Sequence, residues 1–302
     1  MKKILQNFFK ILPHLLFVAL LLVIIFLPDS KDVEIENKIP FIIVAIIFEV
    51  QLLLQWKKAA IYDVTSIVFL ILLIWDFKAT KFATGRKLLL PSPENVFQIF
   101  VSDYPKIIEG LISSFRLLGI GFLFALVLGV VFGMITGWFT RVYDTVMPIV
   151  KVISPIPAII YTPYAIACLP SFQIAQIFVL AISMFWGIFL NIVYRVSHVE
   201  KEIVDSARTL NLSSSSMFFH ILFPYSVPSV INALSGSLTS AFMVLTAAEM
   251  IGARSGLGWF VKYYSDYADY TRVVAGIIII GIVVTVLNIV IKFADQKLVR
   301  WH

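Results

Sequence analysis

Long uninterrupted apolar runs dominate this 302-residue chain. A helix that crosses a bilayer needs about 20 mostly apolar residues, because its backbone polar groups must be satisfied within the segment. Hydrophobic residues make up 60% of the chain and charged residues only 14%. That leaves too little polar surface to cover a water-soluble globule and too much apolar surface for a disordered chain. The sequence therefore predicts an all-α fold, a polytopic membrane helix bundle.

Eight apolar runs are candidate transmembrane helices, at residues 11–28, 39–56, 59–76, 113–138, 146–168, 172–194, 225–249 and 273–292. The second and third carry Glu49 and Asp63, for which we expect pairing with Lys57 or Lys58. In the short loops, Lys and Arg are concentrated on the side of the N-terminus, which predicts that both termini lie in the cytoplasm. The basic segment 77–112 is then nominally outside, so the orientation depends on the short loops. The net charge of +6 is interpreted as a topology signal and not as a nucleic-acid site.

Motifs of the common enzyme classes are missing from the sequence. It has no G-x-x-x-x-G-K-[ST] loop for ATP, no H-E-x-x-H, no G-x-S-x-G and no Cys/His cluster. We therefore expect no catalytic residue, cofactor or metal in this chain. A secondary carrier and a membrane-embedded enzyme are two classes to which a helical membrane protein can belong. A carrier needs acidic residues near the centres of its core spans, and an enzyme needs a His, Asp or Glu constellation at one membrane face. Neither is visible.

One polar segment, residues 199–224, has apolar side chains at helical spacing. They are Val204, Ala207, Leu210, Met217, Phe218 and Ile221. The spacing predicts two short amphipathic helices joined at Asn211, a residue type that tolerates the left-handed conformation. Ser213 or Ser214 is expected to cap the second helix, and Pro224 is expected to end or bend it. We call residues 199–224 the connecting segment. Its exposed apolar side chains fit a groove in a partner, and equally a surface of its own bundle or the lipid headgroups.

The connecting segment resembles the cytoplasmic signature of bacterial ABC-importer permeases, E-A-A, three residues, G, nine residues, I-x-L-P. In this chain the signature reads Asp205-Ser206-Ala207, Asn211 and Ile221-Leu222-Phe223-Pro224 at the same spacing. Four positions differ, each conservatively, and Asn in place of Gly still accepts the left-handed region. The resemblance implies that residues from Val204 to Pro224 dock into a separate ATPase.

Further stretches resemble the nitrate/sulfonate/taurine-type branch of that family, over about residues 75–302. They are Leu90-Pro91-Ser92-Pro93, Ser114-Phe115-Arg116, the glycines Gly129, Gly133 and Gly137, Pro157 with Pro163, Ala248-Glu249-Met250-Ile251-Gly252, Ser255-Gly256-Leu257-Gly258, and Arg300-Trp301. The resemblance implies a six-helix permease core in residues 59–302, preceded by two extra N-terminal helices in residues 1–58.

The same resemblance implies a set of partners. A cytoplasmic ABC ATPase dimer would bind ATP and Mg²⁺, and an extracytoplasmic binding protein would deliver the substrate. A second permease chain, expected to be another copy of this one, would complete the pathway in the lipid bilayer of the bacterial inner membrane. The substrate is expected to be a small organic or inorganic anion or a molecule like a vitamin precursor.

Several residues are left with two interpretations each. Gly129, Gly133 and Gly137 form one helix face, which is either a sliding face or a site of plain close packing. The prolines at 155, 157 and 163 either interrupt a helix that lines the pathway or form a static kink. Arg116 and Glu249, near outer helix ends, either snorkel or serve the pathway: Arg116 by attracting an anion, Glu249 by holding the mouth or meeting the binding protein. In the family, Ser255, Gly256 and Gly258 open the loop that faces the binding protein.

Overall fold

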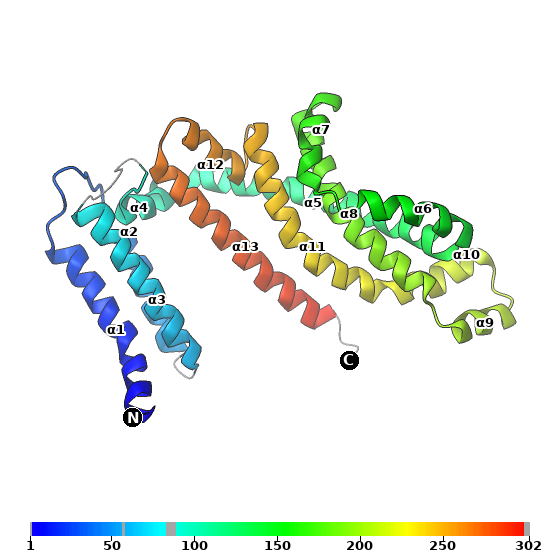
Figure 1. Ribbon diagram of the computed structural model, residues 1–302, viewed down its shortest axis with the longest axis horizontal. Coiled ribbons are helices and arrows are strands. Elements are labelled where there is room, and N and C mark those ends of the chain that lie inside the picture. The colour runs from blue at the N-terminus through cyan, green and yellow to red at the C-terminus, as the bar shows by residue number, and fades with distance from the viewer. Residues whose placement is uncertain (1, 56–57, 83–88, 299–302) are drawn as a thin grey trace. The chain divides into compact units, whose positions relative to one another are not determined.

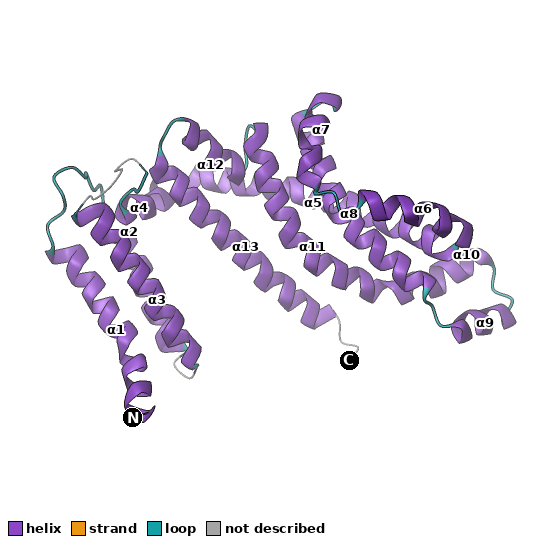
Figure 2. Ribbon diagram, in the orientation of Figure 1, coloured by secondary structure: helices purple, strands orange, loops and turns teal. Residues whose placement is uncertain are grey.

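A computed structural model describes residues 2–55, 58–82 and 89–298, and every regular element within these ranges is helical (Figure 2). The α-helices are α1 (Lys2–Phe26), α2 (Ile39–Leu54), α3 (Ala59–Asp76), α4 (Pro93–Ser102), α5 (Tyr104–Trp138), α6 (Thr140–Ile153), α7 (Thr162–Cys168), α8 (Phe172–Ser197), α9 (Lys201–Thr209), α10 (Ser214–Met217), α11 (Phe223–Gly252), α12 (Leu257–Asp266) and α13 (Tyr270–Leu298). Two π-helices, η1 (Phe77–Lys81) and η3 (Phe218–Leu222), and one 3₁₀-helix, η2 (Ala158–Tyr161), complete the set.

The helical membrane fold is confirmed, whereas the count of eight spans is not. Among the described residues, six helices are long and apolar enough to cross a membrane. Helix α2 has 16 residues, which at 1.5 Å per residue is about 24 Å, short of the hydrocarbon thickness of about 30 Å. The predicted fifth span is broken, as its prolines led us to expect, and α6 and the η2–α7 stretch meet at 84°.

Helix α5 begins earlier than the apolar pattern predicts. It starts at Tyr104, nine residues before the expected start at 113, and runs for 35 residues. Pro105 stands at the start of the helix, where its missing N–H costs nothing. Lys106 and Glu109 lie in the first turns and delay the apolar run, so hydropathy alone placed the boundary too late.

The chain divides into two compact units, Met1–Ile108 with Val261–Ile278 and Glu109–Phe260 with Ile279–His302. In the first unit α1 packs against α3, and α2 packs against α4 (Figure 1). Its core consists of Leu20, Ile24, Phe41, Ala45, Phe69, Leu72 and Phe97. The boundary predicted at residue 58 is not tested by this division and stays a prediction.

Glu49 has a different partner from the one that the sequence suggested. Its carboxylate pairs with Nδ1 of His14, which lies one helix earlier in the same unit. The expected pairing with Lys58 is therefore wrong, and Lys57 lies outside the described residues. Asp63 is exposed on α3. The sequence could not identify His14 because the contact spans 35 residues.

In the second unit, α8 packs along α11 and also contacts α6 through Val150, Phe189 and Val193. A small-residue cluster of Ala158, Ala165 and Ala175 joins the bent α6–η2–α7 stretch to the start of α8. Large apolar side chains face outward on the long helices, such as Ile282 and Ile289 of α13, which are 50% and 63% exposed. Such surfaces suit contact with lipid and not with water.

Candidate functional site

The backbone of the connecting segment folds as a helix, a bend and a second helix. Helix α9 ends at Thr209, and Asn211 then has a φ of 51°. This left-handed conformation was predicted at Asn211, and it lies in the short connection between α9 and α10. The hydroxyl of Ser213 accepts the N–H of Ser216 at 3.2 Å and so caps α10, which was one of the two caps expected.

The apolar side chains of this segment divide into buried and exposed ones. The sequence predicted that all of them would be exposed. That prediction is wrong for Ala207 and Met217, which are 2% and 5% exposed, whereas Leu210 is 72% exposed. Ala207 lies in a groove of about 400 Å³ that Leu210 and Ile221 also line. The segment therefore presents Leu210, the most exposed of these side chains, beside a mainly apolar groove.

The remaining members of the signature surround that groove or point outward. Val204, Phe218 and Ile221 are half-buried, and Phe223 is 43% exposed. Ser206 lines the groove, and the backbone carbonyl of Asp205 accepts the hydroxyl of Thr209 at 2.9 Å.

Pro224 does not end the second helix, so the first of the two expected alternatives is wrong, and the helix runs on into the next span. Helix α10 continues through the π-helix Phe218–Leu222 directly into α11, and Pro224 stands in the first turn of α11. A proline inside an α-helix lacks the N–H for the usual hydrogen bond and clashes with the carbonyl four residues earlier. The wider π turn before Pro224 relaxes both requirements. The connecting segment is thus continuous with a long membrane helix.

The other end of the connecting segment is also attached to the bundle. The guanidinium of Arg195, near the end of α8, lies 4.0 Å from the ring centroid of Tyr225 in α11. Its Nε also donates to the carbonyl of Tyr225 at 3.4 Å. This contact joins the end of α8 to the start of α11, and the two helices also pack along each other.

The glycine face of α5 packs directly against α8. A Cβ added at Gly129, Gly133 or Gly137 would lie 2.8 Å from a side-chain carbon of Ile188, Ile192 or Val196. A Cβ added at Gly121 would lie equally close to Leu180, and Ala125, between Gly121 and Gly129 on α5, is fully buried. Every fourth residue from 121 to 137 is therefore Gly or Ala. This longer pattern is visible in the sequence, but the expected glycine face included only its last three positions. The geometry is that of close packing, and sliding along this face stays a prediction.

The proline-rich stretch forms a sharp break. Helix α6 ends at Ile153, Pro157 precedes η2, and Pro163 stands in the first turn of α7. Thr162 is 1% exposed, and its hydroxyl has no hydrogen-bond partner among the described residues. The interruption expected from the prolines is present, whereas its role in a pathway stays a prediction.

Glu249 is a buried clamp, so the expectation that it snorkels is wrong. It is 1% exposed, and its carboxylate accepts the hydroxyl of Ser114 at 2.6 Å and the N–H of Gly258 at 2.7 Å. The Ser114 hydroxyl in turn accepts the N–H of Leu257 at 3.0 Å. These contacts satisfy N–H groups at the start of α12, where a negative charge is favourable. Arg116, by contrast, is exposed.

The loop above this clamp requires its glycines. Gly256 has a φ of 121°, and a Cβ there would lie 2.3 Å from the carboxyl carbon of Glu249. At Gly258 an added Cβ would lie 2.1 Å from the carbonyl oxygen of Thr246. Ser255 donates to or accepts from Ser113 at 2.7 Å. The four-residue motif is therefore fixed against α5 and α11, whatever binds to its outer side.

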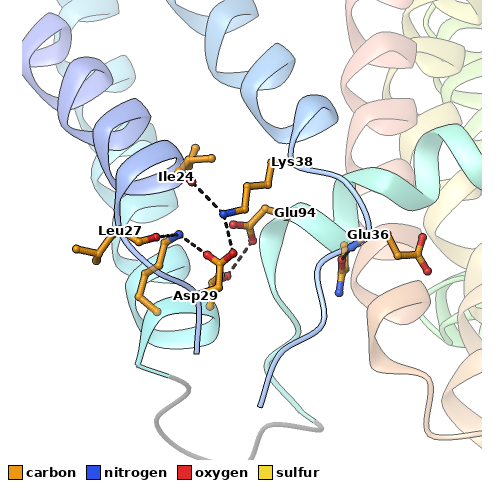
Figure 3. A network of polar contacts seen from close by, with 9 residues as sticks. Ile24, Leu27, Asp29, Glu36, Lys38 and Glu94 are labelled. Atoms are coloured by element: carbon orange, nitrogen blue, oxygen red, sulfur yellow. Dashed lines mark hydrogen bonds and ion pairs between the residues drawn. The ribbon is translucent and has the colours of Figure 1, made fainter. Parts of the chain in front are cut away.

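The first unit contains a partly buried ionic cluster that the sequence did not predict (Figure 3). Asp29 pairs with both Lys38 and Lys81 at 2.6 Å. The two ammonium groups also donate to the backbone carbonyls of Ile24 and Leu27 at 3.2 Å, which stabilises the C-terminal end of α1. From the sequence, Lys81 was interpreted only as a topology signal. Its partner Asp29 lies 52 positions away, and only folding brings the two residues together.

Glu94, at the start of α4, is a buried acid in the same unit whose pKa is raised. It is fully buried and accepts the hydroxyl of Thr80 at 2.8 Å. Burial, together with the neighbouring charge of Asp76, raises the pKa of Glu94 from 4.5 to about 7. The folded chain therefore holds one more proton here than the unfolded chain between these two pH values.

We expect the stability of the wild-type chain to fall as the pH rises from 4.5 to about 7 and then to level off. Replacing Glu94 with glutamine keeps an acceptor for Thr80 but removes the titration, so the loss of stability over this pH range should be smaller by on the order of 2–3 kcal/mol. Thermal unfolding in detergent between pH 5 and 8 measures this; a slope unchanged in Glu94→Gln would contradict the assignment.

The matches to known proteins agree on one family. A family model described as binding-protein-dependent transport system inner membrane component matches residues 125–301. The nitrate import permease protein NrtB of Synechocystis sp. is 28% identical over 246 residues, which cover 77% of this chain and 87% of that protein. The taurine transport system permease protein TauC of Escherichia coli is 22% identical over 82% of this chain and 94% of its own length.

A solved structure shares the fold. The chain resembles an inward-facing conformation of the MetNI methionine ABC transporter with a TM-score of 0.51 and 21% identity, over 65% of this chain and 94% of the other. The resemblance noted at Arg300-Trp301 lies outside the described residues. Among the described residues, no group of three or more His, Cys, Asp or Glu could hold a metal ion.

Proposed function

Because the chain belongs to the family of binding-protein-dependent transport system inner membrane components, we propose that it couples to a cytoplasmic ABC ATPase through its connecting segment. The chain is an ABC-importer permease, and members of this family are not themselves enzymes. The observation that carries the proposal is the projecting Leu210 beside the apolar groove of Ala207 and Ile221.

The partners follow from this proposal. An ATPase dimer binds ATP and Mg²⁺, a binding protein delivers substrate on the opposite side, and a second copy of this chain completes the pathway. Both termini lie in the cytoplasm, which puts the connecting segment on the side of the ATPase and the loop of Ser255 to Gly258 on the side of the binding protein. The inner membrane is the location named in the family's description.

Coupling uses the attachment of the connecting segment to α8 and α11. When the ATPase dimer closes, the two connecting segments are drawn together, and each moves as part of its pair of helices. The Arg195–Tyr225 contact supports this rigid movement. The glycine face of α5 lets α8 approach closely enough for the helices to move as one body, which is rigid-body alternating access driven by a partner.

The substrate that we propose is a small anion of the nitrate or sulfonate type. The support is the naming of two relatives for nitrate and for taurine, together with the exposed cation Arg116 on α5. Specificity is set mostly by the binding protein.

Charge at Leu210 tests the coupling most simply. A glutamate there has to be desolvated in any apolar groove that receives the leucine, so recovery of the ATPase should fall about tenfold or more. The measurement is co-purification of a tagged chain in mild detergent, with companions quantified by mass spectrometry. The control is Ser215→Glu, which adds the same charge at an exposed polar position in the same segment.

The expected result is a P-loop ATPase that accompanies the wild type and Ser215→Glu but not Leu210→Glu, with all three chains equally monodisperse. An ATPase retained by Leu210→Glu would show that this face is not the docking surface.

A further inference from the structure

A pocket of about 440 Å³ lies in the second unit, at the start of α8 and beside the loop that follows α11. Its polar lining comes from both elements and from α5: Ser113, Ser171, Gln173, Gln176, Arg254 and Ser255. No carboxylate is among the residues that line it, and Arg254 is the charged one. The nearby Glu249 is already engaged by Ser114 and Gly258.

The N-terminus of α8 opens into this pocket. Ser171 caps the helix, with its hydroxyl accepting the N–H of Ile174 at 3.3 Å and its carbonyl accepting that of Ala175 at 3.0 Å. The N–H groups of Phe172 and Gln173, both lining residues, have no acceptor within the helix. At the end of a 26-residue helix these groups and the helix dipole favour an anion.

A second, independent feature also points to a ligand. The side chain of Gln176, one turn into α8, lines the pocket while being only 2% exposed. Its Nε2 has no hydrogen-bond partner among the described residues. A buried amide donor is normally satisfied, because leaving it unpaired costs the full desolvation of the group. An acceptor oxygen placed in the pocket would satisfy it.

We propose that this pocket is a binding site for a small oxyanion, held by the N-terminus of α8, the amide of Gln176 and the charge of Arg254. Ser113 and Ser255 are hydrogen-bonded to each other at 2.7 Å, so the hydroxyl that accepts this bond keeps its own O–H as a further donor. Leu117 and Phe172 form an apolar wall that suits a short alkyl sulfonate as well as nitrate. Its role as the first permease site for the substrate rests on the proposed function, whereas anion binding itself does not.

Thiol labelling tests the site without requiring transport. Ser255→Cys in a Cys168→Ser background leaves one cysteine in the chain, inside the pocket. The rate at which this cysteine is modified is measured in detergent with two reagents. One is the anionic 2-sulfonatoethyl methanethiosulfonate, and the other is the cationic 2-(trimethylammonio)ethyl methanethiosulfonate. The native Cys168, which is exposed and does not line the pocket, provides the matched reference in the wild-type chain.

We expect the ratio of anionic to cationic labelling at Ser255→Cys to exceed that at Cys168 by about tenfold, since a cleft of one charge sign concentrates ions of the other. Nitrate should slow labelling relative to chloride at equal ionic strength. Arg254→Gln should lower the ratio, Arg254→Lys should keep it, and Gln176→Leu should weaken the protection by nitrate. Gln173→Cys gives a second reporter if Ser255→Cys does not fold.

Equal ratios at the two cysteines, with no protection by nitrate, would overturn the proposal. That result leaves the ATPase co-purification untouched, so failure of the site and failure of the proposed function are separate outcomes. Conversely, anion-selective labelling of a chain that retains no ATPase would support the pocket and contradict the coupling.

Discussion

Replacing Gly133 with leucine is expected to destabilise the second unit by more than about 3 kcal/mol, at the upper end of overpacking effects. A Cβ at this position would lie 2.8 Å from Cβ of Ile192 and 3.1 Å from the carbonyl oxygen of Phe189. The second neighbour is backbone, which cannot rotate away, so α5 and α8 would have to separate along their length. Loss of that contact also removes the close approach that distinguishes this helix pair.

The measurement is thermal unfolding of the purified chain in detergent, together with the fraction recovered as a monodisperse species. Gly119→Leu is the matched control, because it lies on the same helix and a Cβ there would meet nothing within 4 Å. We expect Gly119→Leu to stay within a few degrees of the wild type. Equal unfolding temperatures for the two variants would show that the glycine face is not a packing interface.

The second large effect is expected at Gly258, where even alanine should displace the loop. The added Cβ would lie 2.1 Å from the carbonyl oxygen of Thr246 and 2.9 Å from Cβ of Glu249. Relief requires moving the start of α12, which withdraws the N–H of Gly258 from the Glu249 carboxylate. A buried acceptor that loses its partner costs about 1–3 kcal/mol, in addition to the steric strain.

Gly281→Ala is the control for Gly258→Ala, since a Cβ at Gly281 meets nothing within 4 Å and alanine favours the helix. Unfolding temperature and protease sensitivity after Arg254 report on the loop in both variants. We expect faster cleavage only in Gly258→Ala. If cleavage and unfolding match the control, the Glu249 clamp does not hold this loop.

Apolar periodicity predicted the membrane class and most long helices, because each of these signals is contained in one segment. Asn211 was predictable for the same reason: the left-handed conformation depends on the residue itself and on the helix that it ends. At Pro224 the sequence left two alternatives open, an end of the second helix or a bend into the next span. The π turn that decides between them is a property of the continuous helix.

Contacts between distant segments were beyond the sequence analysis. Glu249 looked like a residue at a helix end, and its burial depends on Ser114, which lies 135 positions earlier. The Asp29–Lys81 pair and the His14–Glu49 pair escaped for the same reason. Side-chain burial in the connecting segment was also misjudged, because a helical face with apolar residues does not tell which of them face the bundle and which project.

Site-specific cross-linking from position 210 tests the coupling of this permease to an ATPase most directly. Leu210→Cys in a Cys168→Ser background, labelled with a photoactivatable maleimide in native membranes, is compared with Tyr164→Cys, which replaces a side chain that is 78% exposed on α7. We predict that the adduct at 210 contains a P-loop ATPase and that its yield changes with ATP, whereas the adduct at 164 contains none. An adduct at 210 without ATPase, or one equal to that at 164, would contradict the account.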